Sequence, residues 1–265
     1  MTKRFLCALV LVASACGASR GPRGPSPEIH DGPPAWMTRG EEVRLDIAAQ
    51  LLAQGNTGGA LDIVRNMRQE GFDSGEVDLL QGRALRMDGL VAESERLLTS
   101  ADEKLKRDAR PSTELCVLLA DDNRVEGAIP HCERATELDP MSAQAWNNLG
   151  FLYLADGRSE PALEATGRAV ELDSTNPLFR NNLALAQAAS GRHEAAFQTF
   201  KSTLPRAIAA FNVGAALERF DDPSQALVYY ERALSFDPTH ADAVAARARL
   251  ATPPEASQPP SGDTP

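Results

Sequence analysis

The sequence contains few aromatic residues, little positive charge and no long apolar run. Phe, Tyr and Trp make up 5% of the 265 residues, although globular cores normally draw much of their buried area from these side chains. A chain this poor in aromatics suggests closely packed helices instead. The formal net charge is −10 and no stretch gathers Lys and Arg, which argues against a nucleic-acid partner. The apolar run from Phe5 to Val12 is far shorter than the roughly 20 residues that span a membrane.

Residue patterns that support catalysis or metal binding are also missing. The four histidines lie far apart, and no two have the His-x₃-His spacing of a metal site. They are His30, His131, His193 and His240. No glycine-rich phosphate loop follows a strand, and no serine lies in a nucleophile elbow. We therefore expect a protein that is not an enzyme, with no catalytic residues, metal, cofactor or small-molecule substrate.

The first fifteen residues have the organisation of an export signal. Lys3 and Arg4 form a short positive segment, and the apolar run follows them. Ala13-Ser14-Ala15 then provides the small residues at which a signal peptide is cut. We therefore predict that residues 1–15 are a signal peptide and that the mature chain is exported from a bacterial cytoplasm.

Cys16 follows directly after the predicted cleavage site. Ala13-Ser14-Ala15-Cys16 resembles the lipobox of bacterial lipoproteins, in which the cysteine is diacylated and becomes the new N terminus, although Ala13 stands where Leu is usual. The resemblance implies a lipid on Cys16 that anchors the chain to a membrane. Gly17 in place of Asp favours the outer membrane, facing the periplasm, by resemblance to lipoprotein sorting in enteric bacteria. The alternative is ordinary cleavage after Ala15, which leaves a soluble periplasmic or secreted protein.

Composition divides the remainder into a helical body between two irregular ends. Residues 16–40 are rich in Gly and Pro, so we predict a flexible tether there. Residues 251–265 contain five Pro and are predicted to form a disordered tail. Residues 41–250 show no β-type alternation and are predicted to be almost entirely helical.

A repeat of 34 residues sets the architecture of the helical body. Trp146, Leu149-Gly150, Tyr153, Ala162 and Ala169 match the tetratricopeptide repeat (TPR) at its positions 4, 7, 8, 11, 20 and 27. The same phase predicts repeats that start near 41, 75, 109, 143, 177 and 207, the last after a four-residue deletion around Leu204-Pro205. The resemblance implies an all-α fold: a right-handed superhelical solenoid of about six helix pairs, with residues 241–250 as a capping helix.

The two positions of closest helix approach carry small side chains in every repeat. Position 8 reads Ala48, Gly82, Cys116, Gly150, Ala184 and Gly214, and position 20 reads Ala60, Ser94, Ala128, Ala162, Ala196 and Ala226. In the third repeat, Cys116 at position 8 and Cys132 at position 24 are expected to face each other across the two antiparallel helices. Because an exported protein meets an oxidising compartment, we treat this pair as a candidate disulfide; the alternative is two small buried apolar residues.

The first helix of each repeat is expected to line a concave binding face through positions 2, 5, 6, 9 and 12. Position 6 is Asn148, Asn182 and Asn212 in the last three repeats, and an amide both donates and accepts hydrogen bonds. The row is similar to the asparagine ladder of the TPR region of O-GlcNAc transferases, which implies binding of an extended peptide through its backbone. The complete candidate groove is Asn147, Asn148, Phe151, Leu154, Asn181, Asn182, Leu185, Phe211 and Asn212. The alternative is an ordinary solvated surface.

Positions 5 and 6 carry no Lys or Arg in any of the six repeats. This departs from the carboxylate clamp of chaperone-binding TPR domains, so we do not expect capture of a C-terminal carboxylate. We expect the partner to be another protein, or an extended segment of one.

The complete layout of lipobox, tether and six repeats resembles two families of bacterial envelope proteins. These are the secretin pilotins of type IV pili and the TPR lipoproteins of tight-adherence (Tad) pilus systems, the latter especially through residues 180–186 (RNNLALA) and Gly191-Arg192. The resemblance implies a scaffold that assists assembly of a secretin, pilus or secretion machine. Two alternatives stay open: a general periplasmic adaptor that recruits a cell-wall or polysaccharide enzyme, and a regulatory domain for an enzyme on a separate chain.

Overall fold

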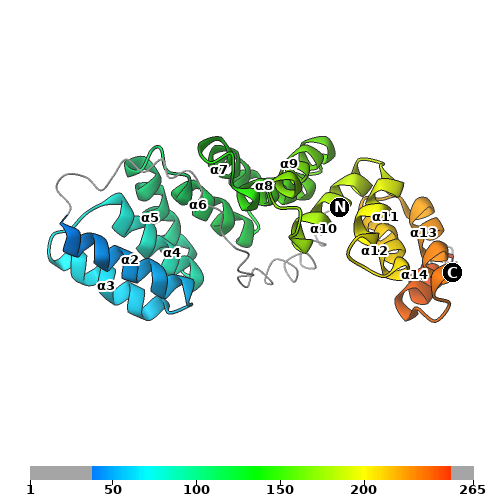
Figure 1. The fold of residues 1–265 in the computed structure, drawn as a ribbon, viewed down its shortest axis with the longest axis horizontal. Coiled ribbons are helices and arrows are strands. Elements are labelled where there is room, and N and C mark those ends of the chain that lie inside the picture. The colour runs from blue at the N-terminus through cyan, green and yellow to red at the C-terminus, as the bar shows by residue number, and fades with distance from the viewer. Residues whose placement is uncertain (1–37, 252–265) are drawn as a thin grey trace, which may run out of the picture. The chain divides into compact units, whose positions relative to one another are not determined.

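The computed structural model describes residues 38–251, and every regular element in this range is a helix (Figure 1). Twelve of the thirteen described helices form six consecutive pairs, and α14 follows them. The bounds are α2 (Arg39–Ala53), α3 (Thr57–Gln69), α4 (Gly75–Met87), α5 (Val91–Lys104), α6 (Ala109–Asp121), α7 (Val125–Leu138), α8 (Ala143–Ala155), α9 (Ser159–Leu172), α10 (Pro177–Ala189), α11 (His193–Lys201), α12 (Arg206–Arg219), α13 (Pro223–Phe236) and α14 (Ala241–Ala251). The predicted all-α fold of about six helix pairs and a final helix is confirmed.

The predicted signal peptide, Cys16, most of the tether and the tail after residue 251 lie outside the described residues. The tether prediction extends into the structure at its last three residues, of which Arg39 and Gly40 are already helical. The Thr38 side chain accepts a hydrogen bond from the Glu41 backbone N–H, while the Glu41 carboxylate accepts one from the Thr38 N–H. This capping box starts α2 at Arg39, two residues before the expected start, and α14 ends one residue later than expected.

The described residues fall into two compact units that divide after Arg158. The N-terminal unit contains α2–α8, and the C-terminal unit contains α9–α14. In the N-terminal unit each helix packs on the next, and the first helices α2, α4, α6 and α8 also contact one another in sequence. In the C-terminal unit α10 contacts α9, α11 and α12, and α13 packs against both α12 and α14. The division separates the two helices of the fourth repeat.

The turn inside each helix pair uses the same backbone conformation. Position 15 of every repeat has a positive φ, between 61° and 80°. The six residues are Gly55, Gly89, Asn123, Gly157, Gly191 and Asp221. Glycine adopts this left-handed region without a steric penalty, and Asn and Asp tolerate it better than other residues. The short loop therefore reverses the chain at a fixed point, which sets the register of the second helix against the first.

Positions 8 and 24 lie against each other between the two helices of a pair. A Cβ added to Gly82 would lie 2.8 Å from the Leu98 side chain, and one added to Gly214 would lie 2.8 Å from the Tyr230 ring. In both repeats a glycine therefore accommodates a large buried side chain. Cys116 and Cys132 occupy the same two positions in the third repeat, between α6 and α7.

Position 4 departs from the aromatic residue that the repeat pattern expects. Only the fourth repeat has Trp there, and the Trp146 indole N–H donates to the Pro140 carbonyl oxygen (3.0 Å). In the third repeat the position holds Ser112, which is fully buried and donates to the Asp102 carboxylate (2.7 Å). The N-terminal unit therefore fills this position with polar groups as well as with an aromatic ring.

Asp78 occupies position 4 of the second repeat and is only 2% exposed. Its carboxylate accepts hydrogen bonds from the Ser100 hydroxyl (2.7 Å) and the Lys104 ammonium (2.8 Å), and it pairs with the Arg68 guanidinium. Burial of Asp78 opposes its ionisation, but these three partners outweigh burial and hold the pKa of the carboxyl below its ordinary value. A charged network therefore connects α3, α4 and α5 through the core.

None of the helices between residues 38 and 251 combines the length and apolarity needed to cross a membrane.

Candidate functional site

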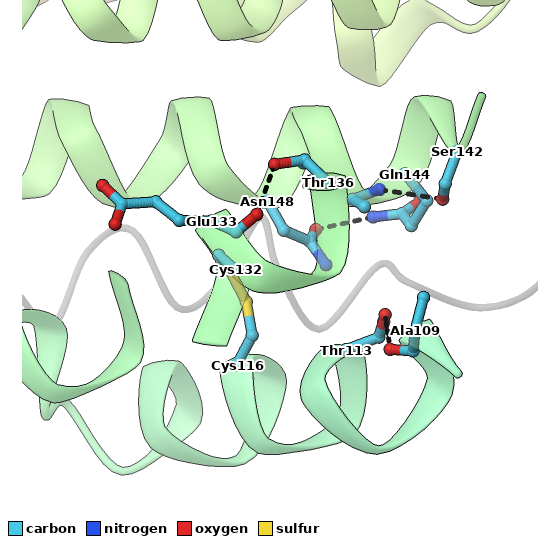
Figure 2. The surroundings of a disulfide bond; sticks show 10 residues. Ala109, Thr113, Cys116, Cys132, Glu133, Thr136, Ser142, Gln144 and Asn148 are labelled. Carbon is cyan, nitrogen blue, oxygen red and sulfur yellow. Dashed lines mark hydrogen bonds between the residues drawn. A yellow bond between two sulfur atoms is a disulfide. The ribbon is translucent and has the colours of Figure 1, made fainter. Parts of the chain in front are cut away.

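The N-terminal unit contains four of the nine candidate groove residues, all on α8. Asn147 and Leu154 are buried, with 3% and 7% exposure, whereas Asn148 and Phe151 are half-buried. The Asn148 side-chain oxygen accepts a hydrogen bond from the Gln144 amide one helical turn earlier (2.7 Å), as Figure 2 shows. The Asn148 amide nitrogen has no such bond to Gln144. In this unit Asn148 and Phe151 are therefore the candidates that a ligand can reach.

The neighbouring first helices of this unit contribute charge to the same face. Arg86 on α4 donates from Nε to the Glu114 carboxylate on α6 (2.8 Å), and the Arg83 Nε lies 3.2 Å from the other oxygen of Glu114. Arg86 also lies 3.7 Å from Asp121. Two arginines at positions 9 and 12 of the second repeat thus share one carboxylate at position 6 of the third.

The C-terminal unit contains the other five candidates, on α10 and α12. Asn182 is 6% exposed, whereas Asn181, Leu185, Phe211 and Asn212 are half-buried. Leu185 and Phe211 pack against the core of this unit. The side-chain oxygen of Asn181 is buried and has no hydrogen-bond partner among residues 38–251. An unsatisfied amide oxygen of this kind is costly, and because it is buried a peptide N–H reaches it only after the Asn181 side chain turns outward.

Phe211 lies within an aromatic cluster that connects α12 to the segments after it. Its ring is 5.5 Å from the Tyr230 ring and stacks on His240 with a centroid distance of 5.0 Å. The Tyr230 hydroxyl donates to Glu218 (2.9 Å), and Arg249 of α14 pairs with the same carboxylate. Burial and this hydrogen bond raise the pKa of the Tyr230 phenol, so Tyr230 remains a neutral donor.

An open pocket of about 810 Å³ lies next to this cluster, at the start of α12 and α14. Ile208 and Phe236 give it an apolar wall and are 38% and 41% exposed, a large fraction for such side chains. His240 forms part of the rim, and its Nδ1 accepts a hydrogen bond from the Ala243 N–H (3.3 Å), which caps α14. The remaining lining residues are Pro205, Arg206, Ala207, Asp237, Ala241 and Asp242. The pocket is large enough for an apolar side chain, and its rim residue His240 stacks on Phe211.

Sequence reasoning did not select Ile208, Phe236 or His240. A signal was present for Ile208, because it occupies position 2 of the sixth repeat, one of the positions expected to face a ligand. Phe236 ends α13 and His240 precedes α14. Their place in the pocket depends on how the chain turns between these helices, which the 34-residue pattern does not specify.

The structure contains a disulfide between Cys116 of α6 and Cys132 of α7 (Figure 2). The two Cα atoms are 5.1 Å apart, within the roughly 7 Å that a bridge allows without backbone movement. Both residues are buried. The bond connects the two helices of the third repeat. Cys16, the candidate lipidation site, lies outside the described residues.

Comparisons with known proteins identify the architecture. Residues 131–164 and residues 152–210 match two sequence profiles of the tetratricopeptide repeat. A solved structure of PilF from Pseudomonas aeruginosa is similar with a TM-score of 0.59 at 17% identity, over 78% of this chain and 96% of that one. The fold is that of a TPR protein.

Two further TPR structures are similar at comparable levels. YrrB, described as a TPR protein with an unusual peptide-binding site, has a TM-score of 0.56 at 18% identity over 69% of this chain and 96% of its own. A TPR protein from Parabacteroides merdae has a TM-score of 0.57 at 16% identity over 79% of this chain and 84% of its own. No curated protein matches the sequence. Identities this low establish the TPR fold and nothing finer.

Proposed function

We propose that this TPR chain is a non-catalytic scaffold that holds an extended segment of another protein on the faces formed by its first helices. The observation that supports this most directly is on α10 and α12 of the C-terminal unit. There the half-buried Asn181 and Asn212 carry side-chain amides that can bond to a peptide backbone. Phe211 and the pocket beside it offer an apolar contact. Backbone hydrogen bonds with a few buried side chains are the usual basis of extended-peptide recognition.

The envelope setting belongs to the same proposal and rests on the N-terminal sequence. Residues 1–15 direct export, and a lipid on Cys16 anchors the mature chain to the outer membrane with the repeats in the periplasm. The disulfide between Cys116 and Cys132 supports export, because such bonds persist in oxidising compartments and are rare in the cytosol. A Cys16→Ser chain is therefore expected in the soluble periplasmic fraction, and its retention in membranes would contradict the lipid anchor.

Within the envelope, we propose that the chain assists assembly of a secretin or of a pilus or secretion machine. The support is the layout of lipobox, tether and six repeats, which resembles the TPR lipoproteins of pilus systems. A crosslinking pull-down from membranes of the native host tests this proposal. Recovery of a secretin multimer or a pilus subunit is the expected result. Recovery of a cell-wall or polysaccharide enzyme instead would favour a general adaptor.

The same pull-down tests the asparagine row. Replacing Asn148, Asn182 and Asn212 by Ala removes three amides, each worth about 0.5–1.5 kcal/mol as a hydrogen-bonding group, so partner recovery should fall at least 10-fold. Because Asn182 is buried, the double variant Asn148→Ala/Asn212→Ala is measured beside the triple variant. Asn66→Ala provides the control, since Asn66 is exposed on the second helix α3. Undiminished recovery with a folded triple variant would refute the role of the row.

A further inference from the structure

The N-terminal unit presents a row of three side chains at position 9 of successive repeats. Arg83, Val117 and Phe151 occupy this position on α4, α6 and α8. These first helices pack side by side, because α4 contacts α6 and α6 contacts α8. All three side chains are partly exposed. The row therefore crosses the face of the unit roughly perpendicular to the helices, with a cation at one end and apolar groups at the other.

The cation at the start of the row is incompletely neutralised. Arg83 has one ion-pair partner within residues 38–251, Glu114, and its Nε makes no hydrogen bond of acceptable geometry there. The same carboxylate accepts the stronger bond from Arg86. The Arg83 side chain is 37% exposed, whereas the Glu114 side chain is 15% exposed. A guanidinium that faces solvent beside a shared, mostly covered carboxylate favours an additional anionic group.

The other end of the row favours an apolar ligand with hydrogen-bonding backbone. Val117 and Phe151 are half-buried, so part of each side chain can still be covered. Asn148 lies on α8 less than one turn before Phe151, and its amide nitrogen has no hydrogen bond to the Gln144 that engages its oxygen. A peptide that covers Phe151 therefore passes an amide donor that can bind its carbonyl oxygen.

We propose that this face selects an extended peptide with an acidic residue on Arg83 and apolar residues three and six positions along the chain. Neighbouring helix axes lie about 8–10 Å apart. An extended chain in the polyproline II conformation advances about 3.1 Å per residue with three residues per turn, so one helix corresponds to about three residues and every third side chain faces the helices. The acidic side chain meets Arg83, the first apolar residue meets Val117, and the second meets Phe151. The inference rests on the proposed peptide-binding function and specifies the chemistry of the bound segment.

Titration calorimetry with synthetic nonapeptides and the mature Cys16→Ser chain tests the pattern. The probe is acetyl-GDSTLSTFG. One comparator, acetyl-GKSTLSTFG, reverses the charge, and another, acetyl-GDSTSSTSG, lacks the apolar residues. The reversed sequence acetyl-GFTSLTSDG tests the opposite chain direction. In the better direction the Asp peptide should bind about 5-fold more tightly than the Lys peptide, and the difference should shrink in high salt. The peptide without apolar residues should bind more weakly than the Asp peptide.

Charge reversal at Arg83 gives the decisive comparison. Arg83→Glu should reverse the preference so that the Lys peptide binds more tightly, and Arg83→Gln should bring the two affinities together. Arg96→Glu makes the same change in net charge at an exposed residue of α5 that forms no ion pair in the described part of the chain, and it should leave the preference unchanged. Circular dichroism establishes that each variant is folded.

Three outcomes would overturn the inference. In the first, the wild-type chain binds the Asp and Lys peptides with equal affinity. In the second, it binds neither peptide measurably. In the third, the folded Arg83→Glu variant keeps the wild-type preference for the Asp peptide. A different result refutes the proposed peptide-binding function: in the pull-down, the asparagine variants recover the partner as well as wild type does. Asn148→Ala should weaken both charged peptides equally, so the two failures are distinguishable.

Discussion

Reduction of the bond between Cys116 and Cys132 should lower the stability of the N-terminal unit by about 3 kcal/mol. The two cysteines are 16 residues apart in sequence, and closing a loop of this length removes about 3 kcal/mol of conformational entropy from the unfolded chain. Both cysteines are buried, and reduced thiols remain acceptable as small apolar residues. We therefore expect the folded state to persist after reduction and the change to arise mainly in the unfolded chain.

The measurement is urea unfolding of the mature Cys16→Ser, Trp36→Phe chain with and without a phosphine reductant. Trp146 then reports on α8 of the N-terminal unit. Reduction should move its transition to lower urea concentration, with a somewhat steeper dependence because the unfolded chain expands when the loop opens. Thiol titration of the unreduced, denatured chain should find no reactive cysteine.

The variant Cys116→Ala/Cys132→Ala is the control for the reductant itself. Its transition should not respond to the phosphine, because it has no bond to break. Two reactive thiols in the unreduced chain would refute the disulfide directly. A shift below about 1 kcal/mol in a chain with no reactive thiol would refute the entropic account of its contribution.

Two further changes test the packing and the buried charge. Gly214→Ala should destabilise the C-terminal unit by about 1–3 kcal/mol, because the new Cβ would lie 2.8 Å from the Tyr230 ring and 3.1 Å from the Ala226 carbonyl oxygen. Gly127→Ala on α7 has open space around its Cβ and should stabilise its unit by about 0.5–1 kcal/mol. Thermal unfolding of both variants measures the two changes. Asp78→Asn should cost about 2–3 kcal/mol at pH 7, since it removes the buried carboxylate that Lys104 and Arg68 share and leaves them paired with the exposed Asp73 alone. Because the folded pKa of Asp78 is lowered, the stabilisation is fully present above the ordinary pKa of 3.8 and is lost as pH falls through the lowered pKa. The unfolding free energies of wild type and Asp78→Asn, measured in urea, should therefore converge in strong acid. A constant difference between these free energies from pH 7 to pH 2 would refute the role of the Asp78 carboxylate.

The helix pairs could be predicted from the sequence because their determinants are local and repeated. Small residues at positions 8 and 20, and a turn residue at position 15, each constrain one helix against its immediate neighbour in the chain. Gly82 and Gly214 illustrate this, since each lies against the side chain sixteen residues later. A pattern with a 34-residue period records such contacts directly.

The polar interior and the pocket could not be predicted in the same way. Asp78 is stabilised by Arg68 ten residues before it and by Lys104 twenty-six residues after it, and no other repeat has this combination. Asn147, Leu154 and Asn182 stand at positions expected to face a ligand, yet the structure buries them. Repeat phase assigns a residue to a side of its helix, whereas exposure depends on the sizes of unrelated neighbours.

The close approach of positions 8 and 24 couples the residues that can occupy them. Ala48 and Val64, Gly82 and Leu98, Ala184 and Phe200, and Gly214 and Tyr230 are all small-and-larger pairs, whereas the third repeat has two cysteines of equal size. Conversion of a glycine–aromatic pair into a cystine needs two substitutions, and either one alone leaves a clash or a cavity. Substitutions at these two positions should therefore covary among related chains. Related chains that carry only one of the two cysteines in the third repeat should be rare.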